Sequence, residues 1–200
     1  MIKKAVAIIV LVMVASLSVA GCTVNPSSTS SPTPTPIASK ETVIGNNTTF
    51  SSAAGFNITY PKTLKTDSTT NASVQARVFV YLGTNNTSAA VSVATEDLDP
   101  NATLTDFAKF NVAQINDFPN YQLISNQSTT LGGKPAYNVV WQASVPVQVD
   151  TTVQNTQLKF MQTYVINNNK GYVVYYKAIP SDYNTYLVQA QQIMNSFKFN

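Results

Sequence analysis

Residues Lys159 to Ile179, KFMQTYVINNNKGYVVYYKAI, carry the clearest structural pattern in the chain. Two runs rich in Tyr, Val and Phe flank a polar connection at residues 167–170, and the second run, 171–179, alternates with a period of two. Such a pattern is typical of a β-hairpin whose strands present one apolar face to a core. The face of the second strand carries Tyr172, Val174, Tyr176 and Ala178.

Further strands are predicted on both sides of this hairpin. Alternation indicates strands at 55–60, at 121–129 and at 135–149, and a second hairpin formed by 75–82 and 89–96. The polar stretch 151–158 is expected to form a long turn or a frayed edge.

Two segments change to helical spacing. The first covers 103–118, with Thr103 as the expected N-cap and Pro119 directly after its end. The second runs from Ser181 towards the C-terminus, with Ser181 or Asp182 as the expected cap. Hairpins interrupted by single helices indicate an α+β fold, a mainly antiparallel β-sheet with two main helices packed on it.

Composition excludes several function classes. The chain has 200 residues, no His, one Cys and a formal net charge of +3. Without His, and with one Cys, it has no Ser-His-Asp triad, no Cys/His dyad and no internal disulfide. Two of the positive charges, Lys3 and Lys4, lie at the N-terminus, so the remainder is almost neutral and lacks the dense basic face of a nucleic-acid binder.

The first 21 residues have the layout of a lipoprotein signal peptide. Lys3 and Lys4 precede an apolar run from Ala5 to Ala15, and small residues follow as far as Gly21. Cys22, the single cysteine, comes next, and this order resembles a lipobox, the lipidation signal of bacterial and archaeal lipoproteins. An uncleaved signal anchor is the alternative. We expect Cys22 to carry a lipid that holds the chain at the extracytoplasmic face of the cell membrane, because two acyl chains anchor stably where one does not.

A linker is expected between the anchor and a single globular domain. Residues 22–42 are rich in Ser, Thr and Pro and cannot form an amphipathic face. The globular domain is predicted to span 43–200.

Eight Asn-x-Ser/Thr sequons occur in the chain, about twice the number expected from its composition. A polar Asn/Thr-rich surface explains them as well as glycosylation does. Adjacent sequons are not expected to be modified together. The glycosylation candidates are Asn47, Asn57, Asn71, Asn86, Asn101 and Asn126.

One acidic cluster offers a weak metal candidate. Asp97, Asp99 and Asn101 have the first spacing of a calcium loop, but Ala102 replaces its glycine and Ala108 its final glutamate. Carboxylates ahead of a helix N-terminus explain the cluster as well. We therefore expect no metal, no cofactor and no catalytic residue. Of the three tyrosines of strand 171–179, we expect at least one to point away from the core.

Four motifs resemble those of the PsbP-like family. They are Phe56–Pro61 (FNITYP), Leu131–Tyr137 (LGGKPAY), Lys170–Val174 (KGYVV) and Asn195–Phe199 (NSFKF). Leu64 stands where the family often has an aromatic residue. The resemblance implies a PsbP-like α/β/α sandwich over about residues 50–199, and the leader, linker and polar surface look like those of archaeal lipoproteins.

The resemblance implies a fold rather than a function. We expect a non-catalytic domain that binds or stabilises another envelope component, with membrane attachment through Cys22, a possible envelope protein as partner and no nucleic acid. The alternative is a module that binds a small ligand or glycan in a pocket between sheet and helix, lined by Tyr or Trp141.

Overall fold

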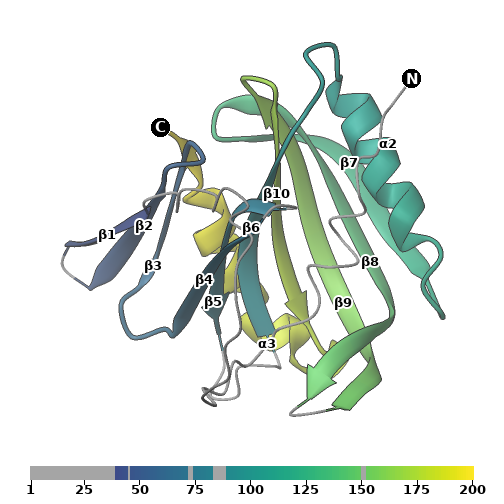
Figure 1. Cartoon of the computed structure of the whole chain (residues 1–200). Coiled ribbons are helices and arrows are strands. Elements are labelled where there is room, and N and C mark those ends of the chain that lie inside the picture. The colour runs from purple at the N-terminus through teal and green to yellow at the C-terminus, as the bar shows by residue number, and fades with distance from the viewer. Residues whose placement is uncertain (1–38, 45, 72–73, 83–88, 150–151) are drawn as a thin grey trace, which may run out of the picture.

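The computed structural model describes residues 39–44, 46–71, 74–82, 89–149 and 152–200. Two antiparallel sheets and two helices make up this part of the chain (Figure 1). The large sheet has seven strands in the order β4-β5-β6-β10-β9-β8-β7, and the small sheet has four in the order β1-β2-β3-β11. The bounds of the strands are Ser39–Ile44 (β1), Asn47–Ser52 (β2), Phe56–Pro61 (β3), Thr66–Asn71 (β4), Val74–Tyr81 (β5), Ala89–Asp97 (β6), Gln122–Leu131 (β7), Lys134–Val149 (β8), Thr152–Asn167 (β9), Lys170–Ala178 (β10) and Lys198–Phe199 (β11).

The predicted hairpin lies at the centre of the large sheet. β9 and β10 pair in register from Lys170 opposite Asn167 to Ala178 opposite Lys159. The connecting residues Asn168 and Asn169 have φ of 51° and 56°. Two consecutive positive φ values are the requirement of a type I′ turn, which asparagine meets better than other residues that carry a Cβ. The polar connection is therefore a tight turn in which asparagine is favoured because two successive residues need positive φ.

Helix α2, Leu104–Ile115, covers one face of the large sheet at β8 and β9. Thr103 caps it as predicted, since its Oγ1 accepts a hydrogen bond from the backbone N–H of Asp106 at 3.1 Å. Phe107, Ala108 and Ile115 are buried under the helix in a core cluster that contains Trp141, Phe160 and Tyr164.

Helix α3, Pro180–Asn195, and the small sheet cover the opposite face. α3 contacts β6, β9 and β10 of the large sheet and β3 of the small one, so a single core cluster joins all of these elements. In Figure 1 the large sheet separates α2 from α3. The α+β class and the α/β/α arrangement are confirmed, with a small sheet added beside α3.

The four family-like motifs meet in one aromatic cluster. Phe56, Tyr172, Phe197 and Phe199 have ring centroids 5.1–6.3 Å apart. Gly132, at φ +58°, lies so close that an added Cβ would come within 2.8 Å of the Phe199 ring. These motifs therefore tie the C-terminal residues to the two sheets, which is a structural role.

Two sequence predictions, one for the stretch 151–158 and one for the cap of the second helix, are wrong. Residues 152–158 belong to β9 and pair with β8. This polar stretch can form a strand because β8 supplies its backbone hydrogen-bond partners, while most of the apolar side chains that face the core here come from β8. Ser181 and Asp182 do not cap α3. The N-cap is Ile179, which makes no side-chain cap bond, and Pro180 fills the first helical turn, where its missing N–H costs nothing.

The tyrosines of β10 are also buried, contrary to the expectation that one is exposed. Tyr172, Tyr175 and Tyr176 have exposed fractions of 2%, 4% and 0%. The core covers both faces of this central strand, so the side chains that point to either face are buried. β1, β2, β4 and β11 were not predicted. The C-terminal helix was expected to continue to Phe199, but α3 ends at Asn195 and Lys198–Phe199 form β11. β1 begins at Ser39, inside the segment assigned to the linker.

Candidate functional site

The edge strand β7 is exposed to solvent along almost its whole length. Its residues Gln122–Thr130 are all exposed, and Leu123 and Ile124 leave 44% and 45% of their surface open to solvent. Among the described strands, β7 pairs with β8 alone, because it ends the strand order. After a register shift between Leu123 and Ser125, seven residues from Ser125 to Leu131 pair without interruption.

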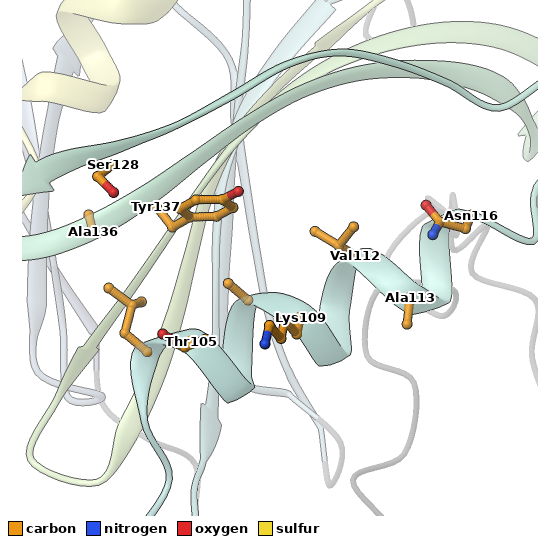
Figure 2. Close-up of a pocket in the computed structure, with 10 residues that line it drawn as sticks. Thr105, Lys109, Val112, Ala113, Asn116, Ser128, Ala136 and Tyr137 are labelled. Carbon is orange, nitrogen blue, oxygen red and sulfur yellow. The ribbon is translucent and has the colours of Figure 1, made fainter.

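A groove of about 400 Å³ opens on the α2 side of β7 (Figure 2). Its wall on the helix consists of Leu104, Ala108 and Val112, and its wall on the sheet includes Tyr137 and Ser128. Figure 2 shows the Tyr137 ring between the sheet and the helix. Polar groups are contributed by Thr105, Lys109 and Asn116, so the groove is apolar with a polar rim.

A smaller hollow of about 160 Å³ lies on the α3 side of the same strand. Leu131, Met161 and Met194 contribute apolar surface to it. The other side chains carry neutral amides or hydroxyls, and Asn138 donates a hydrogen bond to Thr163 Oγ1 at 2.9 Å. They are Gln127, Thr129, Thr130, Asn138, Thr163, Gln191 and Asn195. β7 is thus flanked by an apolar groove on one face and a neutral polar hollow on the other.

Glu96 is the carboxylate most affected by its surroundings. It lies near the end of β6, and burial raises its pKa to about 7, while a hydrogen bond from Asn111 acts in the opposite direction. The Asn111 amide also donates to the Phe107 carbonyl oxygen at 2.8 Å. Burial on the sheet side of α2 therefore gives Glu96 a titration near neutral pH.

Trp141 stabilises the core and does not line the groove. It is fully buried and stacks on Phe160 with ring centroids 4.2 Å apart. Its Nε1 donates to Gln162 Oε1 at 2.9 Å, and the Tyr164 hydroxyl donates to the same oxygen at 2.6 Å. Of the aromatic residues expected to line a pocket, Tyr or Trp141, a tyrosine, Tyr137, lines the groove and Trp141 does not.

The acidic cluster does not gather into a metal centre. Asp97 forms an ion pair with Lys170 at 2.7 Å, and Asp99 lies exposed ahead of α2. Within the part of the chain that the structure describes, no three His, Cys, Asp or Glu residues are placed to share a metal ion. Asp97 and Asp99 stay weak candidates, and the helix-terminus explanation fits their positions.

The sequons differ in accessibility. Asn47, Asn101 and Asn126 are exposed, at the start of β2, before α2 and within β7. Asn57 is half-buried in β3, and its Oδ1 is buried with no hydrogen-bond partner among the described residues. Cys22, Asn86 and the side chain of Asn71 lie outside the described residues.

The edge, the groove and the hollow were not predicted as a site. Lys109 lies in no motif, Tyr137 was noted only as the last residue of the family-like motif Leu131–Tyr137, and β7 was predicted only as a strand. The sequence feature that could have indicated an exposed edge is the polarity of β7. QLISNQSTT is polar on both alternating faces, which is typical of a strand without a covered face. No described helix is long and apolar enough to cross a membrane.

Solved structures with a similar fold include two with TM-scores above 0.5. The solution structure of cyanobacterial PsbP (CyanoP) from Synechocystis matches with a TM-score of 0.53 and 14% identity, covering 88% of this chain and 100% of that one. The crystal structure of LpqN, described as involved in cell envelope biogenesis of Mycobacterium tuberculosis, matches with a TM-score of 0.51 and 11% identity, covering 82% and 91%.

At these identities the likeness concerns the fold alone. A search of curated proteins found no significant match. The family model of PsbP-like proteins matches residues 2–199, nearly the whole chain. This chain therefore belongs to the PsbP-like protein family.

Proposed function

We propose that this PsbP-like chain is a lipid-anchored domain of the extracytoplasmic membrane face, and that it binds another component of the cell envelope. The observation that carries the binding role is the exposed, uncharged edge β7 with a groove and a hollow on its two faces. A strand that ends a sheet presents unpaired N–H and C=O groups to any partner.

The anchoring is supported by the sequence. Cys22 directly follows an apolar run and small residues, and it is the single cysteine of the chain. A Ser/Thr/Pro-rich linker after such an anchor holds the domain away from the lipid surface. The envelope role described for LpqN agrees with this location, although the two chains share only 11% identity.

A binding role is favoured over a catalytic one. The chain contains no His, and the acid with a pKa near neutrality, Glu96, is half-buried beside Asn111 on the sheet side of α2. The residues that line the groove contribute one titratable cation, Lys109, and the phenol of Tyr137. General acid–base catalysis most often uses His, Asp or Glu, and the lining of this groove contains none of the three.

The test is crosslinking in the native membrane followed by mass spectrometry. We expect a mature chain that begins at lipidated Cys22 and a recurrent crosslinked envelope protein. Cys22→Ser is expected to leave the precursor unprocessed or to release it into the medium, and the partner should be lost with it. Normal processing and retention of this variant would refute the anchor.

A second candidate function rests on the groove. Its volume of about 400 Å³ and its ring of Tyr137 suit a small amphiphile or glycan. In that case a small molecule copurifies with the chain, Tyr137→Ala removes it, and no recurrent protein partner is found.

A further inference from the structure

We infer that β7 receives an extended segment of another envelope protein as an additional strand of the large sheet. This inference rests on the proposed function and names the kind of partner and the way it binds. Strand addition uses main-chain hydrogen bonds for affinity and alternate side-chain pockets for specificity, and both elements are present at this edge.

The first step is that, within the part of the chain that the structure describes, β7 lacks the usual protection of an edge. Natural sheets guard exposed edges with charged residues, proline, short strands or bulges. β7 has ten residues, no charged residue and no proline, and its irregularity at Ile124 leaves Ser125–Leu131 regular. At the opposite edge, β4 has six residues, includes the exposed Asp67 and is irregular between Thr69 and Asn71.

The second step is the placement of the groove and the hollow on opposite faces of β7. Side chains of a strand point alternately to the two faces of a sheet. Ser128 lies opposite Tyr137 and borders the groove on the α2 side, whereas Gln127 lies opposite Asn138 and borders the hollow on the α3 side. A strand added beside β7 therefore directs alternate side chains towards the apolar groove and the polar hollow.

The third step is charge. The strands β7, β8 and β9 contain no Asp or Glu, and Lys109 and Lys134 lie beside the groove and at the β7–β8 turn. The complementary segment is apolar at one set of alternate positions and hydroxyl- or amide-bearing at the other. It lacks Lys and Arg and carries an acidic residue at the end nearest Lys134.

Two occupants from this protein itself, its own linker and a second copy of the chain, fit the edge less well. The linker of this chain has proline at 32, 34 and 36, and proline cannot donate a ladder hydrogen bond. A second copy would pair β7 with β7. Its residues Asn126 and Ser128, which share the α2 side, carry polar side chains that do not suit an apolar groove.

The test maps the register of the complex. A benzophenone amino acid replaces Ser125, Gln127 or Thr129 in turn in the full anchored chain, and Val188, a residue of α3 that is 67% exposed, serves as control. After irradiation in the native membrane, mass spectrometry identifies the crosslinked residue of the partner. Strand addition predicts that this residue moves in one direction by about two positions for each step of two along β7.

A matched pair of variants completes the test. Thr129→Lys places a charge on the edge and should lower the crosslink yield from the Ser125 probe about tenfold, whereas Val188→Lys should leave it unchanged. Thermal unfolding of both variants shows that they are folded. Capture through Val188 but not through β7, or crosslinks without register order, overturns strand addition and leaves the proposed function standing. Crosslinks to a second copy also overturn it, and no protein captured from any position overturns both.

Discussion

The ring of Phe107 lies on the backbone of Gly171, so that a Cβ added to Gly171 would come within 2.6 Å of Phe107 Cζ. This contact joins α2 to β10 at the end of the sheet where Glu96 also lies, opposite Gly171 in β6. Gly171 is required here because of close approach, not because of its backbone angles.

Gly171→Ala is therefore expected to destabilise the fold by about 1–3 kcal/mol, the usual cost of overpacking a core. Urea unfolding measures the change. Phe107→Leu in the same chain should recover part of the loss, since the smaller side chain leaves room for the methyl group. Strict additivity of the two substitutions would show that the contact is not the cause.

Glu96 is expected to make stability depend on pH. Its pKa rises from 4.5 in the unfolded chain to about 7 in the folded one, so the folded state binds the proton more tightly. The contribution of Glu96 protonation to the free energy of unfolding is fully present below about pH 4.5 and is lost as the pH rises through about 7.

Glu96→Gln should remove this dependence and stabilise the protein above pH 7 by roughly 1–3 kcal/mol. Urea midpoints between pH 4 and pH 9 provide the measurement. Asp117→Asn, an exposed carboxyl just after α2, is the matched control and should leave the slope unchanged. An unaltered slope in the Glu96 variant would contradict the argument.

Gln162 is expected to be a stabilising residue of the core. Its Oε1 accepts hydrogen bonds from both Trp141 and Tyr164, and the side chain is 2% exposed. Gln162→Leu leaves two buried donors unpaired, which should cost about 2–4 kcal/mol. The fluorescence of Trp141, the single tryptophan, follows the unfolding transition directly. Gln154→Leu, an exposed position of the same strand, should change stability by less than about 0.5 kcal/mol.

Glycan mapping should separate the sequons by exposure. We expect any glycans on the described residues at Asn47, Asn101 or Asn126 and none at Asn57, whose amide oxygen is buried in β3. Peptide mass spectrometry of the native protein before and after deglycosylation provides the measurement. A glycan on Asn57 would mean that β3 forms only after modification or is placed differently.

Much of the fold could be predicted because local pattern and tertiary position agree. The β9–β10 hairpin alternates on both strands and has asparagines that tolerate positive φ. Thr103 caps α2 because the capping hydrogen bond is local. β1, β2 and β4 escaped prediction because short polar strands gain most of their stability from partners distant in the chain.

The α+β class, the two helices, the family motifs and a lone cysteine after an apolar leader could be read from the sequence. These follow from periodicity and from short-range chemistry. Long-range packing, in contrast, brings the motifs into one aromatic cluster, buries Tyr175 and leaves β7 exposed at an edge. Strand order determines which strand has one neighbour and which has two, and it is determined by packing across the whole chain.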